Sequence, residues 1–158
     1  MREAAAAPDT VTALKCELAA EVLRASGKLR LGVTGWSMLP TVWPGDVVVI
    51  ERTSHDSVNE GDIVLLGRDR RFVVHRVVRK GRASQLVTRG DAMPQADPPA
   101  GENELLGKVS AIVRSGKCIK PAKMLRLRER AVAALVQRSR FAARVVVGAH
   151  GFRRTYLN

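Results

Sequence analysis

The octapeptide Thr34-Gly35-Trp36-Ser37-Met38-Leu39-Pro40-Thr41 lies between the first two of a series of short β-branched segments. Gly35 gives the backbone freedom just before Ser37, and Pro40 restricts it just afterwards. The pattern predicts a strand that ends in a sharp turn, with the Ser37 hydroxyl held between two large apolar neighbours, Trp36 and Met38. Such a turn is one way to present a nucleophile, although a serine in a simple turn can also bond a nearby backbone group.

Short β-branched segments separated by glycine-aspartate turns fill the middle of the chain. The predicted strands are Leu29–Val33, Asp46–Glu51, Asp62–Leu66, Arg71–Arg79, Ser84–Thr88 and Leu105–Arg114. Asp46 and Asp62 each follow a glycine and precede an apolar segment, so we expect both to close turns by accepting backbone N–H groups. Many short strands at this spacing favour a mainly β fold with a coiled, mostly antiparallel sheet.

A helix is predicted on each side of this β region. Residues Thr10–Ser26 carry an apolar stripe that we expect to pack on the core or to dock on a partner: Val11, Leu14, Leu18, Val22 and Ala25. After Pro121 a second stripe recurs at helical spacing among many arginines: Met124, Leu127, Ala131, Leu135, Ala142 and Val146. This basic helix either binds an anionic lipid or an acidic partner, or packs one face on the domain. The chain therefore divides into an N-terminal lead-in with its helix (1–28), a β domain (29–116) and a basic helical tail (117–158).

Composition and charge exclude several classes of protein. The 158 residues suffice for one domain, and the net charge of +12 is concentrated after residue 116, where eleven lysines and arginines oppose the single acid Glu129. The two cysteines, Cys16 and Cys118, form no metal-ligand pattern, so we expect small buried side chains, with a single disulfide between the two as the alternative, and no metal or cofactor. Met1–Pro8 lacks the apolar core of a signal peptide, and no run of roughly 18 apolar residues occurs. We therefore expect a cytoplasmic protein whose contact with a membrane, if it has any, is peripheral.

Two features of the β region place polar side chains where a functional site could lie: a histidine within an apolar strand, and a loop with two aspartates. His75 lies within Phe72–Val78, an otherwise apolar strand, and its imidazole needs a polar partner if that face of the strand is the inner one. A buried structural histidine is the alternative. The loop Gly90–Pro99 is a rigid, polar excursion that contains two carboxylates, Asp91 and Asp97, and such loops often hold site residues. The other histidines stand in polar or glycine-flanked segments, where we expect them on the surface: His55 and His150.

Five short boxes, in this order, resemble the type I signal peptidase superfamily. They are Gly-Xaa-Ser-Met-Xaa-Pro-Thr at 35–41, Pro-Gly-Asp at 44–46, Gly-Asp-Ile-Val at 61–64, Val-His-Arg-Val at 74–77 and Thr-Arg-Gly-Asp at 88–91, with Asp97 beyond. The resemblance covers about Leu29–Val113, most of the expected folded region. Five boxes in order are far more specific than any one of them, and they imply the coiled β domain of that superfamily.

The resemblance also implies roles for particular residues. His75 stands where bacterial signal peptidases and self-cleaving repressors carry a lysine, as in the histidine-type signal peptidases of archaea and the endoplasmic reticulum. By this resemblance Ser37 is the nucleophile, His75 the general base, and Asp97, or else Asp91, the carboxylate that orients the base. Substrate and oxyanion are expected beside the turn, at Gly35, Trp36, Met38 and Pro40. Gly35 occupies the position of the usual oxyanion-hole serine, which leaves oxyanion stabilisation to backbone N–H groups.

The function implied by the resemblance is that of a serine endopeptidase, which cleaves an extended peptide or precursor protein after a small residue such as alanine. One alternative is a self-cleaving protein like the repressors, cut near Ala25-Ser26-Gly27. A second alternative is an inactive peptide-binding module, held to an anionic membrane or to nucleic acid by the basic tail. Nucleic acid is the weaker choice of polyanion, because few aromatic residues are present to stack on bases.

Overall fold

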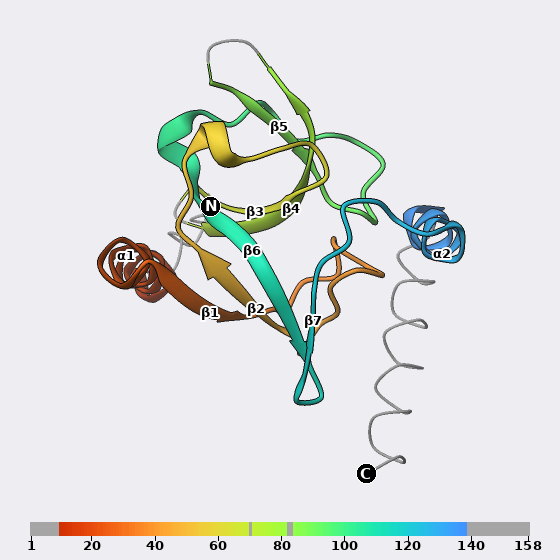
Figure 1. The fold of residues 1–158 in the computed structure, drawn as a ribbon, viewed down its shortest axis with the longest axis horizontal. Coiled ribbons are helices and arrows are strands. Elements are labelled where there is room, and N and C mark those ends of the chain that lie inside the picture. The colour runs from red at the N-terminus through yellow and green to blue at the C-terminus, as the bar shows by residue number, and fades with distance from the viewer. Residues whose placement is uncertain (1–9, 70, 82–83, 139–158) are drawn as a thin grey trace, which may run out of the picture.

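A ten-residue strand, β6 (Leu105–Arg114), lies at the centre of the sheet in the computed structural model, which describes residues 10–69, 71–81 and 84–138. One edge of β6 pairs with β2 (Val47–Glu51), and the other edge pairs first with β3 (Ile63–Arg68) and then with β7 (Lys117–Ile119). The strand order is β1-β2-β6-β3-β4-β5, and every neighbouring pair is antiparallel (Figure 1). The remaining elements are α1 (Thr10–Ser26), β1 (Lys28–Gly32), η1 (His55–Ser57), β4 (Arg71–Lys80), β5 (Leu86–Arg89), η2 (Glu102–Glu104) and α2 (Leu127–Arg138).

The prediction of a mainly β, antiparallel fold is confirmed. Each of the six predicted strands is present, with ends that differ from the prediction by two residues or fewer. Strand β7 was not predicted, because its three residues are too few to give a strand pattern in the sequence. That turn, at Ser115 and Gly116, has φ angles of +48° and +75°, the two positive values that a tight hairpin connection requires.

Strand β3 is covered on both faces of the sheet. In β3 four consecutive residues, Ile63–Leu66, are buried. Ile63 and Leu65 join an apolar cluster with Leu23 of α1, whereas Val64 and Leu66 point to the opposite face and join a second cluster with Val77 and Leu86. Successive side chains of a strand alternate between faces, so an unbroken apolar run indicates a strand covered on both sides.

Helix α1 begins and ends as predicted, but it buries a different face. Leu23 is buried, whereas Leu14, Leu18 and Val22 are about half exposed. The expectation that this stripe packs on the core is therefore wrong. On the inner face Leu23 joins the main core, and Ala19 and Ala20 are partly buried, so the helix packs through one large apolar residue and not through the row of them.

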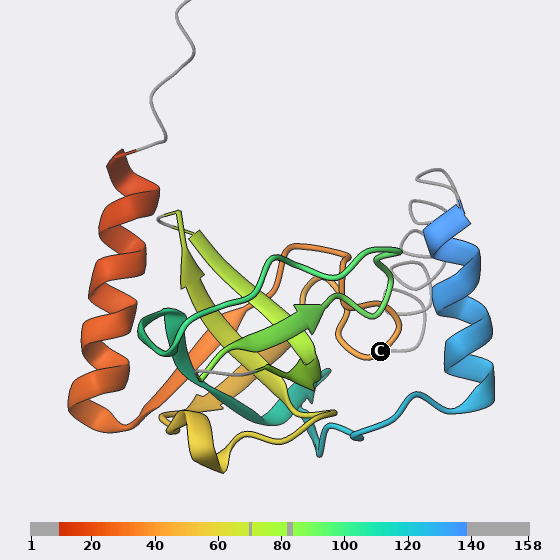
Figure 2. The same ribbon diagram turned by 90° about the horizontal axis from the view of Figure 1, so that it is seen from above.

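Helix α2 lies on the opposite side of the sheet from α1, as Figures 1 and 2 both show. It packs Val136 against Leu39 and Ala92, which are buried in a third apolar cluster. The predicted stripe points away from the domain, because Met124, Leu127 and Leu135 are exposed. Two members of that stripe, Ala142 and Val146, lie outside the described residues. The interpretation of a helix that packs one face on the domain thus holds for Leu127–Arg138, but through other residues than those predicted.

Several single residues complete the comparison with the sequence. Asp46 accepts a hydrogen bond from Trp43 N at 2.8 Å and Asp62 accepts one from Asn59 N at 2.9 Å, so their predicted role in turns is confirmed. Two predictions are wrong: Cys118 is a free, exposed thiol on β7, and His55 is buried.

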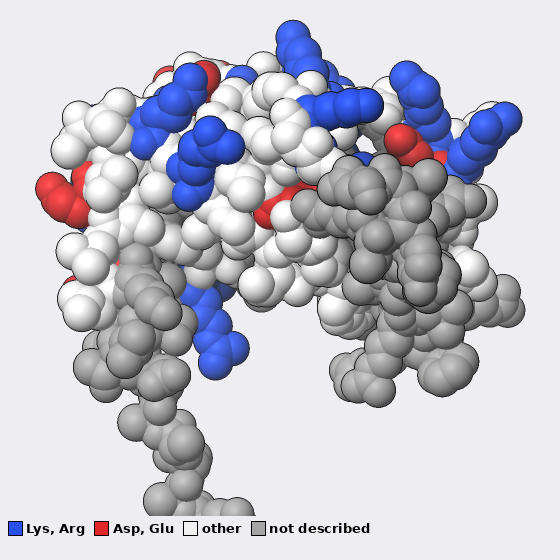
Figure 3. Space-filling view, turned by 90° about the horizontal axis from the view of Figure 1, so that it is seen from below, with Lys and Arg blue, Asp and Glu red and all other residues white. Residues whose placement is uncertain are grey.

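Seen from below, basic side chains are more prominent than acidic ones on the surface (Figure 3). Within the described residues no helix is both long and apolar enough to cross a lipid bilayer.

Candidate active site

Ser37 lies in a turn that is held by backbone hydrogen bonds and by two buried side chains. The turn follows β1, and it is held by hydrogen bonds from Leu39 N to Trp36 O (3.1 Å) and from Val42 N to Met38 O (3.0 Å). The two residues after Ser37 are buried in different apolar clusters, Met38 with the main core and Leu39 with Ala92 and Val136. Both anchors restrain the backbone that carries the serine, and the turn that the octapeptide predicted is present.

His75 lies between Ser37 and Asp97 and contacts both. The distance from His75 Nε2 to Ser37 Oγ is 3.0 Å, and that from His75 Nδ1 to Asp97 Oδ2 is 2.6 Å. The His75 side chain is 11% exposed, so its strand does turn this face inward. Residues from three separate parts of the chain, the turn after β1, strand β4 and the loop after β5, thus form one line of hydrogen-bonding groups.

The carboxylate of Asp97 is held in its ionised form. Burial opposes ionisation, but hydrogen bonds from His75 and from Thr88 Oγ1 (2.7 Å), together with the charge of Arg68 and that of His75 whenever it is protonated, lower the pKa of Asp97 below its ordinary value. Asp97 N also donates to Thr88 O at 2.8 Å, which fixes the backbone of this loop on β5. An ionised carboxylate can only accept, so Nδ1 of His75 carries the proton and donates it. The lone pair of Nε2 then faces the Ser37 hydroxyl, as a general base requires.

Asp91, the second candidate carboxylate, is bound elsewhere. Its two oxygens accept hydrogen bonds from Arg76 Nε (2.7 Å) and Arg76 Nη2 (2.8 Å), and Thr41 Oγ1 donates to it as well. Arg76 also donates to the carbonyls of Gly61 and Ala122, and its side chain and that of Asp91 are almost entirely buried. This ion pair connects β4 with the loop after β5 and with the segment before α2. Of the two acidic residues, it is Asp97 that contacts His75.

A glycine makes room where the loop after β5 crosses the serine. A Cβ atom at Gly90 would lie 2.6 Å from Ser37 O and 3.1 Å from His75 Nε2. Ala92 N donates to Ser37 O at 2.9 Å, so the loop is bonded to the turn at this crossing. Any larger residue at position 90 would separate the loop from the turn or displace the imidazole.

A groove of about 340 Å³ leads to Ser37 and His75. It is lined by the segment from Leu31 to Gly35 and by the start of β4, with Phe72 and Val74. Of the four residues expected around substrate and oxyanion, Gly35 and Met38 line this groove, and Trp36 is about one-third exposed. Pro40 does not line the groove; its carbonyl accepts a hydrogen bond from Trp43 Nε1 at 2.7 Å. A Cβ at Gly35 would meet no atom within 4 Å, so the site has space for a larger residue there.

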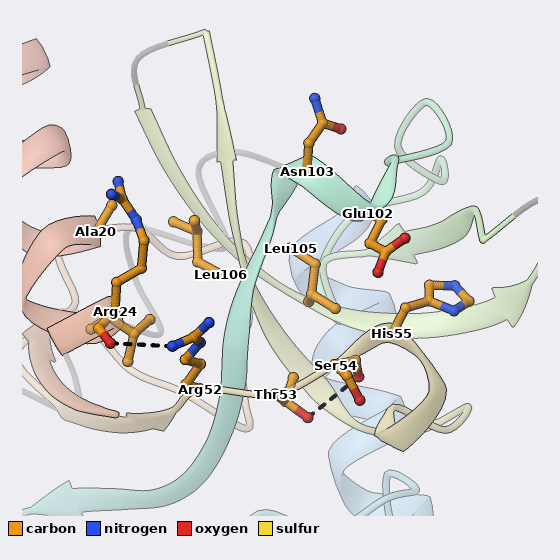
Figure 4. A pocket seen from close by; sticks show the side chains of 11 residues that line it. Ala20, Arg24, Arg52, Thr53, Ser54, His55, Glu102, Asn103, Leu105 and Leu106 are labelled. Atoms are coloured by element: carbon orange, nitrogen blue, oxygen red, sulfur yellow. Dashed lines mark hydrogen bonds between the residues drawn. The ribbon is translucent and has the colours of Figure 1, made fainter. Parts of the chain in front are cut away.

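A larger cavity, of about 500 Å³, lies away from this site between the end of α1, the segment 52–55 and the start of β6. Its polar groups do not converge. Arg52 donates to Arg24 O at 3.2 Å, and Asn103 points away from the other labelled side chains (Figure 4). His55 is buried, neither ring nitrogen has a hydrogen-bond partner among the described residues, and Asp56 Oδ1 is 3.8 Å from Nδ1. Ser37 and His75 therefore line the smaller groove and not this larger cavity.

Comparison with known proteins agrees with this geometry. A model of the Peptidase S24-like family matches residues 3–110, more than half of the chain and a range that includes every residue of the site. The chain belongs to the Peptidase S24-like family. A search of curated protein sequences found no significant match. Membership of this family confirms the predicted superfamily and the serine-peptidase type of fold.

Several residues around the S24-like site were not identified from the sequence: Thr88, Arg68, Arg76 and Gly90. Thr88 and Gly90 belong to the Thr-Arg-Gly-Asp box, and Arg76 follows His75 directly, so each was quoted as part of a motif without a role. Arg68 had no local signal, because it lies 29 residues before Asp97 in the sequence. In the described part of the chain, no group of three histidine, cysteine, aspartate or glutamate side chains is placed to hold a metal ion.

Proposed function

We propose that this chain is a serine endopeptidase of the signal-peptidase-like type, with Ser37 as nucleophile, His75 as general base and Asp97 as the carboxylate that orients the base. The observation that carries the proposal is the unbroken line Ser37 Oγ, His75 Nε2, His75 Nδ1, Asp97 Oδ2, with separations of 3.0 and 2.6 Å. A serine hydroxyl becomes an effective nucleophile when a base within hydrogen-bond reach takes its proton. No metal or cofactor is needed for this chemistry.

Each step of the proposed reaction uses groups of the site. His75 Nε2 takes the Ser37 proton as Oγ attacks the peptide carbonyl, and backbone N–H groups of the turn, that of Ser37 among them, receive the negative charge on oxygen. The imidazolium is stabilised by ionised Asp97 and gives its proton to the departing amine. A water molecule, activated by the same imidazole, then hydrolyses the acyl-enzyme and releases Ser37.

The groove supports an extended peptide as substrate. Strand β1 is at one end of the strand order, so its outer edge has unpaired backbone groups, and Leu31–Gly35 continues that edge along the groove to Ser37. An extended peptide can add to such an edge as a further strand. Met38, Phe72 and Val74 give the groove an apolar lining near Ser37, in keeping with a small apolar residue such as alanine before the cleaved bond.

Cleavage of another chain is favoured over self-cleavage near Ala25-Ser26-Gly27. Ala25 and Ser26 belong to the last turn of α1, where Gly27 N donates to Leu23 O at 3.0 Å and Ser26 Oγ donates to Val22 O at 2.7 Å. A peptidase acts on an extended segment, so this turn would have to unwind before cleavage. A purified chain whose mass stays that of residues 1–158 agrees with cleavage in trans, and a product that begins at Ser26 or Gly27 contradicts it.

A mixed peptide library tests the proposal, with products located by mass spectrometry. The wild type is expected to cut after small residues, and Ser37→Ala is expected to make no cuts while its thermal unfolding stays unchanged. Retained cleavage by Ser37→Ala would reject Ser37 as the nucleophile. A well-folded wild type that cuts none of the peptides would favour the inactive binding module instead.

A further inference from the structure

The face of α2 that turns away from the domain is apolar. Leu127 is 83% exposed and Leu135 is 56% exposed, and Met124, just before the helix, is 78% exposed. On a helix with 3.6 residues per turn, Leu127, Ala131 and Leu135 follow one another at intervals of four and share one face. The side that packs on the domain carries Ala133 and Val136, roughly opposite. We call Met124, Leu127, Ala131 and Leu135 the outer stripe.

Basic side chains lie on both sides of the outer stripe. Helical geometry places Arg128 on one side of Leu127 and Arg130 on the other, and both are exposed. Arg130 also lines a shallow cavity of about 200 Å³ with Arg89 and Met124. Among the residues that the structure describes, none of these three arginines forms an ion pair. Glu129, the one acid of the helix, is turned to its start, where it accepts a hydrogen bond from Arg126 N at 2.7 Å.

We propose that the outer stripe of α2, with Arg89, Arg128 and Arg130 beside it, docks the protein on a membrane that contains anionic phospholipid. An interfacial helix inserts a row of large apolar side chains among the acyl chains and places arginines at the level of the phosphates. Helix α2 has both parts, and it lies at the edge of the molecule, where a flat surface can reach it (Figures 1 and 2). The proposal does not depend on the peptidase activity.

Charge distinguishes α2 from α1, which has an exposed apolar stripe of similar size. Leu14 and Leu18 of α1 are 55% and 58% exposed, but Glu17 and Glu21 are exposed beside them. Carboxylates at that place are repelled by anionic headgroups, so α1 is the less suitable surface. Nucleic acid would satisfy the arginines of α2, but it would leave Leu127 and Leu135 in water. Apolar and basic groups in one surface therefore favour lipid.

The test is flotation of the full chain with lipid vesicles, either phosphatidylcholine alone or phosphatidylcholine mixed with phosphatidylglycerol. The wild type is expected to bind the mixed vesicles, to bind them less as salt is added, and to leave phosphatidylcholine vesicles almost free. The double variants Leu127→Gln with Leu135→Gln, and Arg128→Gln with Arg130→Gln, are each expected to weaken binding by at least about tenfold. The matched control, Leu14→Gln with Leu18→Gln on α1, is expected to bind within about twofold of the wild type.

Each of the other outcomes would overturn the proposal. If the wild type fails to bind the mixed vesicles, or if the leucine variant of α2 binds them as the wild type does, the outer stripe is not a membrane-binding surface. Binding to the mixed vesicles that needs the arginines but tolerates loss of both leucines would indicate electrostatic attraction to the lipid phosphates alone, with no insertion of the outer stripe. Thermal unfolding of every variant shows that the fold is intact, which is expected because all of the substituted side chains are exposed.

Discussion

Asp97→Asn is the substitution that most sharply tests how His75 is oriented. Asp97 Oδ2 accepts from both His75 Nδ1 and Thr88 Oγ1. An asparagine in this place presents either its amide N–H₂, which forces the imidazole proton onto Nε2, or its uncharged carbonyl oxygen. The first removes the base that faces Ser37, and the second leaves the imidazolium without a counter-ion.

The expected fall in kcat follows from the distance between His75 Nδ1 and Asp97 Oδ2. Two unit charges 2.6 Å apart attract by about 6 kcal/mol at an effective dielectric constant of about 20. The Asp97 side chain is 24% exposed, so solvent screens part of this attraction. A remaining 4 to 5 kcal/mol, as a rough value, corresponds to a fall in kcat of about 10³- to 10⁴-fold. We expect that fall in a variant that remains folded.

The assay is steady-state cleavage of one peptide by the wild type, Asp97→Asn and Asp91→Asn. Asp91→Asn breaks the buried pair with Arg76, so we expect it to lower the free energy of unfolding by about 3 kcal/mol or more. The kcat of the molecules that remain folded is expected to stay within about tenfold of the wild type, since Asp91 does not contact His75. The reverse pattern, a nearly active Asp97→Asn and an inactive but folded Asp91→Asn, would refute this assignment.

Three further predictions concern the same site. Gly35→Ser is expected to raise kcat by as much as roughly 10²-fold, the contribution of one oxyanion-hole donor, because the new hydroxyl can donate to the oxyanion and a Cβ at this position meets no atom within 4 Å. Gly35→Ala, which adds a Cβ without a hydroxyl, is the control. Equal kcat values for the two variants in the peptide assay would contradict the prediction. Gly90→Ala is expected to lower kcat by at least about tenfold, because its Cβ would lie 2.6 Å from Ser37 O; thermal unfolding separates this effect from loss of the fold, and an unchanged kcat would reject the steric argument. Because the pKa of Asp97 lies below its ordinary value of 3.8, its ionised form stabilises the fold above that pH, and the contribution is lost as the pH falls through the lower folded-state pKa. Denaturant titrations at about pH 6 and about pH 3 measure the free energy of unfolding, which should fall more between these pH values for the wild type than for Asp97→Asn. Equal falls for the two proteins would contradict the lowered pKa of Asp97.

Local sequence was sufficient to predict most of the strands. Their β-branched residues and the turns between them are short-range signals, and Asp46 and Asp62 close those turns through backbone N–H groups only three residues away. The serine turn was also readable, because its anchors Met38 and Leu39 directly follow Ser37. These features depend on neighbours in the sequence, which is why they could be predicted without the fold.

Features that depend on distant contacts could not be predicted in the same way. Asp91 and Asp97 lie in one loop, and what separates them is that Arg76 binds one and His75 binds the other. Since Arg76 and His75 are neighbours on a strand, they point to opposite faces, and only the folded loop shows which carboxylate meets which residue. The helices gave the same difficulty, because the row of largest apolar residues in α2 includes Leu127 and Leu135, which face solvent.

The central claim is that Ser37 and His75 act as one catalytic unit, and non-additivity of their substitutions tests it most directly. Cleavage of the best library peptide is measured with the wild type, Ser37→Ala, His75→Ala and the double variant. Because the two side chains are 3.0 Å apart and share one proton transfer, each single variant is expected to lose about as much activity as the double variant. Losses that multiply in the double variant, or a His75→Ala protein that keeps most of its activity, would contradict the account.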